Sequence, residues 1–415
     1  MSHILDVYLQ KDTLVGTLEQ IENGALIFTY DANYLNTALY GISISLPLQE
    51  EPYTGSVVKA YFSGLLPDDN IRKRLAQNLG ISDTNTFALL EAVGGDCAGA
   101  LALYPHGDKP SEVSQDVELL DDKRLLEVLD LIKRRPMMAG DNGYRLSLAG
   151  AQNKLAVGFR NGHVELIKGG APTTHILKPI IEHSAIKDSA HNELFCMRLA
   201  KKIAIDVPNT ELHFVGDIPY YLIERYDRHI DKNGMVTRIH QEDFCQAMGF
   251  MPEMKYENEG GPNIDQCQQL INQYTIHPAR AQLKFLDMII FNYLIGNNDA
   301  HGKNFSLLYK SNKPELAPAY DLLSTAVYPS LSSKMAMKIG GKYKPSEVCL
   351  RYFYKLTKDT QTAKSAMDKQ IKAMGDKIVD KAITLRTTLK SDGIQSEIFA
   401  DIINLIEDRL RFLKG

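Results

Sequence analysis

Residues 296–304 read Gly-Asn-Asn-Asp-Ala-His-Gly-Lys-Asn and follow a strongly apolar run that is typical of a buried helix. This stretch places an aspartate, Asp299, five residues ahead of an asparagine, Asn304. In phosphoryl transfer, an aspartate so placed accepts the proton of the attacking hydroxyl, and an asparagine one short loop later holds magnesium on the phosphates. The spacing therefore indicates a catalytic loop, although Asp and Asn also cap helix ends for purely structural reasons.

A second carboxylate supports this interpretation. Asp321 directly follows two apolar segments, 305–309 and 316–320, which a polar turn separates and which are predicted to pair as a hairpin. If they pair, Asp321 returns beside Asn304. An aspartate and an asparagine around an open position suit magnesium, which prefers few carboxylates together with phosphate oxygens and water.

A lysine and a glutamate upstream are candidates for a phosphate site. Lys178 ends a predicted strand, where its ammonium could reach the non-transferred phosphates of a nucleotide; an exposed lysine at a strand end is the structural alternative. Glu193 begins the next predicted helix and could pair with Lys178, as a lysine and a glutamate do in kinases. Glutamates are also common at helix starts because they suit the helix dipole, so both interpretations stay open.

Two further segments have the chemistry of nucleotide contacts. Residues 147–154 read Ser-Leu-Ala-Gly-Ala-Gln-Asn-Lys before a predicted strand, and their small side chains would let backbone N–H groups approach phosphate oxygens. They match neither G-x-G-x-x-G nor a Walker sequence, and small-residue turns are common. Residues 224–226, Glu-Arg-Tyr, lie where two lobes would join, so their backbone could bond an adenine edge, with chance placement as the rival explanation.

The elements that must position these residues divide the chain into three predicted domains. Residues 1–105 alternate short apolar runs with turn residues and include a helical stretch, which indicates a small α+β domain. Residues 106–228, which open with a linker ending at 115, show strands around a helix and indicate a nucleotide-binding lobe. Residues 229–415 are mostly helical and carry the hairpin. The predicted fold is therefore α+β and bilobal, like that of kinases.

Individual elements follow from the periodicity of the apolar residues. A strand is predicted at 42–46, further strands at 155–159 and 175–178, and a hairpin within 213–226. Helices are predicted at 193–204, 281–295, 364–389 and 396–413.

Composition and charge narrow the class of protein. The chain has 415 residues, of which 44% are hydrophobic and 24% are charged, so apolar material suffices for more than one core. The net charge of -4 argues against a protein that coats nucleic acid by itself. The five cysteines include no C-x-x-C pair, and the sequence has neither a signal-like start nor an apolar run of about 18 residues. We therefore expect a cytoplasmic protein without a membrane partner.

Several motifs occur in order over nearly the whole chain. They are Phe-Ser-Gly-Leu-Leu-Pro at 62–67, the segment 147–154, Thr-Thr-His-Ile-Leu-Lys at 173–178, Glu-Arg-Tyr-Asp-Arg at 224–228, Gln-Glu-Asp at 241–243, Lys-Tyr-Glu at 255–257, Gly-Gly-Pro at 260–262 and the loop 299–304. Together they resemble the HipA family, the serine/threonine-kinase toxins of bacterial toxin-antitoxin modules. Small departures, at Asn153 and Leu155, touch none of the proposed catalytic groups.

The resemblance implies a role for each candidate residue. Asp299 would be the catalytic base, Asn304 and Asp321 would hold Mg2+, and Lys178 would contact the phosphates of ATP. The other implied ATP contacts are the phosphate-binding loop Ala149, Gly150, Ala151, Gln152, Asn153 and Lys154, the adenine hinge Glu224, Arg225 and Tyr226, and His301, Gly302, Lys303 and Tyr320, with Asn304 and Asp321. Ser147 matches the family's autophosphorylated serine, whose modification pulls the loop out of the ATP site and switches the enzyme off.

The resemblance also implies a function and partners. The chain would be an ATP- and Mg2+-dependent serine/threonine-protein kinase toxin, with glutamyl-tRNA synthetase as the family's precedent substrate. A HipB-like helix-turn-helix antitoxin would bind it and connect it to operator DNA. One alternative is a phosphatidylinositol-kinase-like small-molecule kinase, because Asp-x-His-x-x-Asn also occurs in that catalytic loop, although no basic amphipathic stretch suggests a lipid substrate. The other is mainly a co-repressor that acts on DNA through its antitoxin.

Overall fold

The computed structural model describes residues 3–10, 12–110, 116–138, 146–168, 170–181 and 185–414. The chain forms two compact units, each assembled from separate stretches of sequence. The first unit comprises Met1–Pro179, His213–Met254 and Ser306–Glu315, and the second comprises Ile180–Leu212, Lys255–Phe305 and Leu316–Gly415. The three-domain division stays a prediction, and residues 111–115 of its linker lie outside the described residues.

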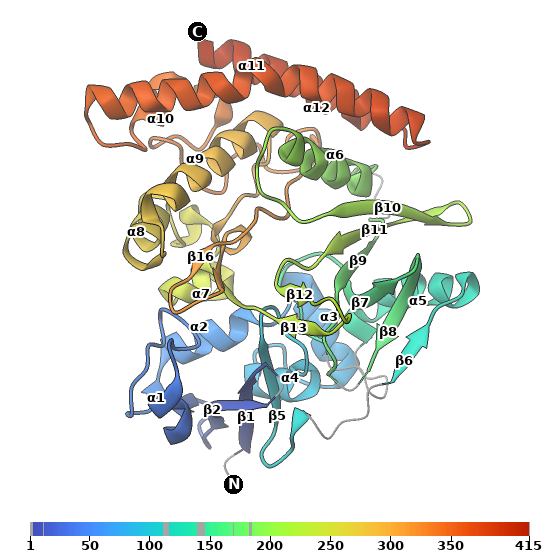
Figure 1. Ribbon diagram of the computed structural model, residues 1–415, viewed down its shortest axis with the longest axis vertical. Helices are drawn as coiled ribbons and strands as arrows, with labels where there is room; N and C mark the ends of the chain where they lie inside the picture. Colours follow the sequence, from blue (N-terminus) through green and yellow to red (C-terminus); the bar gives the residue numbers. More distant parts are fainter. Residues whose placement is uncertain are drawn as a thin grey trace. The chain divides into compact units, whose positions relative to one another are not determined.

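A five-stranded antiparallel sheet in the order β4-β3-β2-β1-β5 opens the first unit (Figure 1). Burial alternates along β3, as expected for a strand with one face on the core. Phe28 of this strand shares that core with Tyr61 and Phe62 of α2. The elements are β1 His3–Leu9, β2 Thr13–Gln20, β3 Leu26–Tyr30, α1 Ala32–Thr37, β4 Tyr53–Thr54, α2 Ser56–Gly64, α3 Asp69–Leu79, α4 Thr86–Val93 and β5 Leu101–Pro105.

The strand predicted at 42–46 is wrong. Ile42 and Leu46 are buried, but the segment makes only an isolated bridge between Ser43 and Leu46. The hydroxyl of Tyr30 accepts a hydrogen bond from the N–H of Ile42 at 2.8 Å and donates one to the carbonyl of Leu46 at 2.5 Å. A side chain therefore satisfies backbone groups that a neighbouring strand would otherwise satisfy.

A six-stranded sheet in the order β10-β11-β9-β7-β8-β6 comes next along the chain. Strands β11, β9, β7 and β8 pair antiparallel in that order. The strands predicted at 155–159 and 175–178 and the hairpin within 213–226 are thereby confirmed. The elements are β6 Val117–Leu119, α5 Asp122–Arg134, β7 Leu155–Arg160, β8 His163–Ile167, β9 His175–Pro179, β10 Thr210–Val215 and β11 Ile218–Glu224.

The hairpin predicted before Asp321 is present in a three-stranded sheet of order β14-β15-β16. Its second strand is short, since Pro318 has no N–H to continue a ladder of hydrogen bonds. The third strand, β14, pairs antiparallel with β15 and was not predicted. The elements of this part are β12 Arg228–Ile230, β13 Val236–Arg238, β14 His240–Asp243, α7 Phe244–Met248, β15 Ser306–Tyr309 and β16 Glu315–Leu316.

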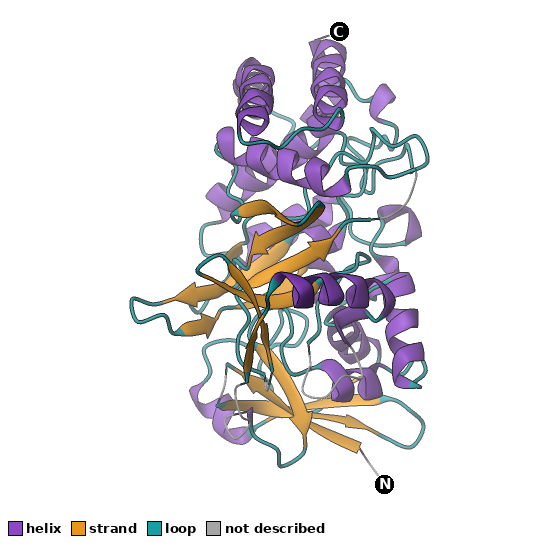
Figure 2. Cartoon of the chain, turned by 90° about the vertical axis from the view of Figure 1, so that its right-hand side faces the viewer, coloured by secondary structure: helices purple, strands orange, loops and turns teal. Residues whose placement is uncertain are grey.

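Helices dominate the second unit, and the last two, α11 and α12, run side by side (Figures 1 and 2). Buried residues of α11, including Met367, Ile371, Met374 and Ile378, recur every three or four positions and give the helix one apolar face. The four predicted helices are confirmed. The elements are α6 Ser189–Lys202, α8 Ile264–Tyr274, α9 Pro278–Ile295, α10 Leu350–Tyr354, α11 Gln361–Ser391 and α12 Ile398–Lys414.

The arrangement confirms the α+β class. Within the described residues, no helix combines the length and the apolar character needed to span a bilayer.

Candidate phosphoryl-transfer site

The predicted catalytic loop begins where α9 ends, and Gly296 makes the turn. Its φ of +75° lies in the left-handed region, which side chains disfavour. A Cβ at this position would lie 2.5 Å from Cδ2 of Leu405 and 2.8 Å from the Cβ of Ala326. Both the backbone conformation and the available space therefore require glycine. The turn at Gly296 fixes the direction in which the loop leaves α9.

Polar side chains then fix the path of the loop. The N–H of Asn298 donates to Oγ1 of Thr325 at 2.8 Å, and the N–H of Asp299 donates to Oδ1 of Asn297 at 3.1 Å. The Nδ2 of Asn304 donates to the carbonyl of Asp299 at 3.0 Å. The backbone of Asp299 is thus bonded on both sides, and this positions its half-buried carboxylate.

One oxygen of the Asp299 carboxylate already accepts a hydrogen bond from a hydroxyl group. The hydroxyl of Tyr256 donates to Oδ1 of Asp299 at 2.7 Å. The ring of Tyr256 packs edge-on against His301, with centroids 5.1 Å apart. The carbonyl of Lys255 accepts a hydrogen bond from the N–H of Gly302 at 3.2 Å. The segment 255–257 therefore braces the catalytic loop.

Asp321 reaches the same loop from β16. Its carbonyl accepts a hydrogen bond from Nδ2 of Asn297 at 3.4 Å, and the neighbouring Tyr320 hydroxyl donates to the carbonyl of Lys303 at 2.7 Å. The φ of Asp321 is +56°, a left-handed conformation that costs a non-glycine residue roughly 1–3 kcal/mol. Such strain is typical of functional positions, where the surrounding contacts enforce it.

The donor atoms at this point fit magnesium. Because Nδ2 of Asn304 is used by the carbonyl of Asp299, its Oδ1 is the atom left to act as a ligand. Asp321 adds a carboxylate, and phosphate oxygens and water would supply the rest of an octahedral shell. The described residues contain no cluster of three or more His, Cys, Asp or Glu that could hold a metal alone. This chemistry suits an ion that arrives with a nucleotide.

The predicted phosphate-binding loop lies in the first unit, and hydrogen bonds hold it against residues 65–68. Ser147 is fully buried, and its Oγ donates to the carbonyl of Leu65 at 2.7 Å. The carbonyl of Gly150 accepts from the N–H of Asp68 at 3.2 Å. Nζ of Lys154 donates to the carbonyl of Ala149 and so crosses the loop. The loop thus packs on residues 65–68, part of which belongs to the motif at 62–67.

Lys178 and Glu193 are both buried. Lys178 lies in β9 opposite Tyr221 and is 5% exposed, so the alternative of an exposed lysine is wrong. Glu193 lies beyond the first turn of α6 and is 2% exposed. A favourable interaction with the helix dipole at the start of the helix therefore does not explain this glutamate. Their pairing stays a prediction, because the two residues belong to different units.

The side chain of Arg225 serves a different purpose from the predicted hinge contact. It is buried and bonds Asp227 at 2.8 Å and Asp96 at 3.4 Å. Arg228 and Arg238 bond the same Asp96 at 2.9 and 3.0 Å. Burial alone would raise the pKa of Asp96, but these guanidinium groups hold it below its ordinary value. The backbone of Arg225 is engaged as well: its N–H donates to the carbonyl of Thr174 at 2.9 Å, and its carbonyl accepts from the N–H of Arg228 at 3.2 Å.

The structure therefore gathers the candidate residues in two groups. The second unit brings together Asp299, His301, Gly302, Lys303, Asn304, Tyr320 and Asp321. The first unit carries Ser147, residues 149–154, Lys178 and residues 224–226. Neither the role of Tyr256 nor the cluster around Asp96 was predicted from the sequence. The motif at 255–257 was the available signal for Tyr256, whereas no spacing connects Asp96 with arginines more than a hundred residues later.

Two family models cover most of the chain. The HipA N-terminal domain matches residues 5–104, and the HipA-like C-terminal domain matches residues 146–383. The solved structure of the Shewanella oneidensis toxin HipA with HipB and operator DNA superposes with a TM-score of 0.83 and 26% identity, covering 98% of this chain and 95% of that one. The fold is therefore the kinase-like bilobal α+β fold that the sequence predicted.

Two relatives are similar over most of their length. The serine/threonine-protein kinase toxin HipA of Shewanella oneidensis is 30% identical over 335 residues, which are 76% of this chain and 73% of the relative. A candidate kinase of Sinorhizobium fredii, Y4mE, is 45% identical over 340 residues, which are 81% of this chain and 80% of the relative. The chain belongs to the HipA family.

Proposed function

We propose that the chain is an ATP- and Mg2+-dependent serine/threonine-protein kinase and the toxin of a toxin-antitoxin module. The observation that carries the proposal is the 2.7 Å hydrogen bond from the Tyr256 hydroxyl to Asp299, because a general base accepts a proton at this distance. An acceptor hydroxyl could donate to Asp299 in the same way. Family membership favours this function over the phosphatidylinositol-kinase-like alternative.

The proposed reaction assigns one task to each group. Asp299 takes the proton from a serine or threonine hydroxyl as its oxygen attacks the γ-phosphorus of ATP, and ADP leaves. Asn304 and Asp321 hold Mg2+, which when bound neutralises phosphate charge. Lys178 and residues 149–154 contact the phosphates, and the backbone of residues 224–226 contacts adenine. His301 to Lys303 and Tyr320 complete the nucleotide site.

Ser147 is the proposed switch. A phosphoserine adds roughly 1.5 to 2 negative charges. It could not keep the buried hydrogen bond of Ser147 to the Leu65 carbonyl, so residues 147–154 would leave their present position. ATP phosphates would then lose their binding loop. We expect mass spectrometry to find Ser147 phosphorylated after incubation with Mg-ATP, and to find a Ser147→Ala variant that stays active for longer. An unmodified Ser147 beside a phosphorylated substrate would contradict the switch.

The proposed partners follow from the family. A HipB-like antitoxin would bind the toxin and connect it to operator DNA, as the composition of the Shewanella oneidensis complex suggests. The net charge of -4 supports DNA binding through a partner. A gel shift with operator DNA should require the antitoxin, and a shift by the toxin alone would contradict this arrangement. The proposed substrate is a cytoplasmic protein of translation, with glutamyl-tRNA synthetase as the first candidate.

Labelling of a cell extract tests the function. The protein is incubated with labelled Mg-ATP and extract, and phosphopeptides are identified. Asp299→Asn removes the charge of the base, and Asp265→Asn, an exposed position on α8, is the matched control. We expect phosphoserine or phosphothreonine on a protein with the wild type and the control only. Labelled lipid or small molecules without labelled protein would contradict the proposal.

A further inference from the structure

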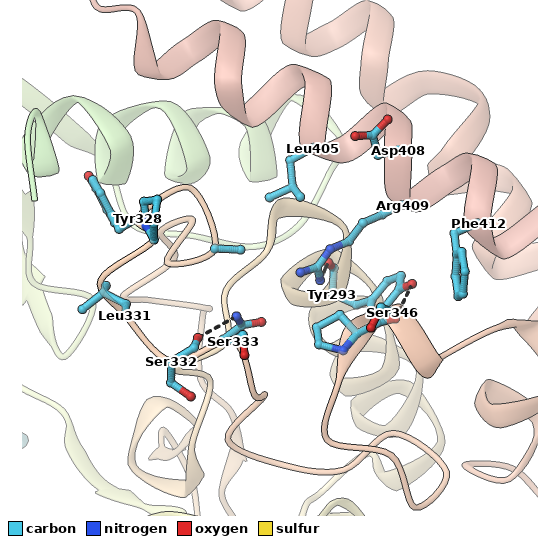
Figure 3. Close-up of a pocket in the computed structure, with 14 residues that line it drawn as sticks. Tyr293, Tyr328, Leu331, Ser332, Ser333, Ser346, Leu405, Asp408, Arg409 and Phe412 are labelled. Carbon is cyan, nitrogen blue, oxygen red and sulfur yellow. Dashed lines mark hydrogen bonds between the residues drawn. The ribbon is translucent and has the colours of Figure 1, made fainter. Parts of the chain in front are cut away.

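A cavity of about 410 Å³ lies within the second unit, next to the residue that precedes Asp299 (Figure 3). Its walls include Asn298 of the catalytic loop, Tyr293 in the last turn of α9, and Leu405, Arg409 and Phe412 of α12. The volume is in the range of small-molecule sites, roughly 300–1,000 Å³. None of the residues proposed to hold ATP or Mg2+ lines it. The cavity is therefore separate from the proposed nucleotide site.

One wall of the cavity presents a buried cation. Arg409 is 8% exposed; its Nη1 donates to the carbonyl of Tyr293, and its guanidinium lies 4.9 Å from the centre of that ring. Among the described residues, no carboxylate forms an ion pair with Arg409, and the neighbouring Asp408 pairs with Arg411. Burial lowers the pKa of Arg409 to about 10. Arginine is seldom buried without a counter-ion, so an anion would stabilise this arrangement.

A second wall presents a buried acceptor. Asn298 is 5% exposed, and its Nδ2 donates to the carbonyl of Ser332 at 3.0 Å. Its Oδ1 is buried and accepts no hydrogen bond from any described residue. An unsatisfied buried acceptor costs roughly 1–3 kcal/mol. A donor of a ligand reaches this oxygen once the Asn298 side chain turns toward the cavity, and the hydrogen bond formed there would remove this cost.

The rest of the lining selects the kind of anion. Apolar side chains, among them Leu331, Leu405 and Phe412, line the space together with three serines (Figure 3). The cavity offers one buried cation, so a ligand with a single negative charge matches it better than a doubly charged phosphate, whose second charge would stay uncompensated. We propose that the cavity binds a small organic carboxylate that carries an amino or hydroxyl donor and an apolar side chain, which is the chemistry of a free apolar amino acid.

Such a ligand would act on the proposed kinase reaction, and this part rests on the proposed function. Arg409 bonds the last turn of α9, and Leu405 packs against Gly296 at the start of the catalytic loop. A carboxylate that takes hydrogen bonds from Arg409 competes with the carbonyl of Tyr293. The loop that carries Asp299 would lose part of its support. We expect saturating ligand to lower the rate of phosphotransfer about fivefold, the lower end of typical allosteric couplings.

Calorimetry on the full chain tests binding without reference to kinase activity. The probes are L-leucine and L-phenylalanine, with leucinamide, which lacks the carboxylate, and 4-methylpentanoate, which lacks the amino group, as controls. Ser346→Trp places a large ring at the exposed edge of the cavity, and Ser391→Trp is the matched exposed control. Arg409→Gln removes the cation.

We expect both amino acids to bind the wild type and Ser391→Trp, and to bind Ser346→Trp and Arg409→Gln at least tenfold more weakly. The two control compounds should also bind at least tenfold more weakly. No binding of either amino acid, equal binding of leucinamide, or unchanged binding to a folded Ser346→Trp would each overturn the site. Binding without any change in phosphotransfer by an active wild type would overturn the coupling but leave the proposed function intact.

Discussion

The hydroxyl of Tyr256 lies 2.7 Å from Oδ1 of Asp299 and donates a hydrogen bond to it. The ring is held in this position by its edge-on contact with His301. In the proposed reaction, an acceptor serine or threonine donates its hydroxyl hydrogen bond to the same carboxylate. In that reaction, Tyr256 competes with the acceptor hydroxyl for Oδ1 of Asp299.

Tyr256→Phe tests this competition. The variant keeps the ring against His301 and removes only the donor. A net hydrogen bond contributes roughly 0.5–1.5 kcal/mol, so we expect kcat/KM for the acceptor to rise about two- to tenfold. The KM for ATP should not change. Steady-state kinetics with varied acceptor checks this expectation; a lower kcat with unchanged acceptor KM would mean that Tyr256 orients the base instead.

Gly296→Ala tests the turn into the catalytic loop, and Gly393→Ala is its matched control. Both glycines have positive φ, but a Cβ at Gly393 meets no atom within 4 Å. The conformational penalty of roughly 1–2 kcal/mol is common to both variants, whereas crowding against Leu405 and Ala326 adds roughly 1–3 kcal/mol at Gly296 alone. Urea unfolding should show the larger loss for Gly296→Ala, together with lower activity. Equal losses would contradict the close packing.

Asp96→Asn tests the buried cluster in the first unit. It removes the carboxylate shared by Arg225, Arg228 and Arg238; the first two keep their ion pairs with Asp227, whereas Arg238 loses the carboxylate that it bonds at 3.0 Å. Breaking a buried ion pair in this way costs roughly 3–5 kcal/mol. Asp130→Asn, which breaks the exposed pair with Arg134, should change stability by less than about 0.5 kcal/mol. If chemical denaturation gives similar small losses for the two variants, the cluster contributes little.

Glu242 makes stability depend on pH. Burial raises its pKa to about 7, although Ser43, Tyr309 and the N–H of Ile44 donate hydrogen bonds that favour the charged form. Between its ordinary pKa of 4.5 and about 7, the folded chain binds more protons than the unfolded chain. The contribution of Glu242 is therefore complete below about pH 4.5 and is lost as pH rises through 7.

Glu242→Gln removes this titration. The wild type should lose more free energy of unfolding between pH 5 and pH 8 than the variant does, and each unit of pKa shift corresponds to about 1.4 kcal/mol. Urea unfolding of both proteins at the two pH values gives the difference. Equal losses in the two proteins would mean that Glu242 titrates near its ordinary pKa.

Local patterns predicted much of the fold. The helices at 281–295 and 364–389 and the hairpin before Asp321 follow from apolar periodicity, which reports one buried face of each element. The strand predicted at 42–46 failed because a side chain outside the segment, the hydroxyl of Tyr30, satisfies its backbone groups. Strand β14 was missed because its partner β15 lies more than sixty residues later.

The candidate site was predictable to a similar degree. The spacing of Asp299 and Asn304 and the position of Asp321 after a hairpin are local features, and the structure brings Asp321 to the loop through Asn297. The role of Tyr256 was not predictable, since it depends on a contact between residues 43 positions apart. Likewise, burial of Arg225 with Asp96 depends on tertiary packing, which periodicity does not encode.

We propose that Asp299 is the base of a kinase, and labelled phosphate transfer from Mg-ATP to Ser147 measures whether it has this role. Asp299→Asn keeps the size of the side chain and removes the charge, while Asp265→Asn controls for charge loss at an exposed site. Thermal melting of each protein establishes that it is folded. We predict that the wild type and Asp265→Asn incorporate label and that folded Asp299→Asn incorporates none. Incorporation by folded Asp299→Asn at the rate of the wild type would mean that Asp299 is not the base.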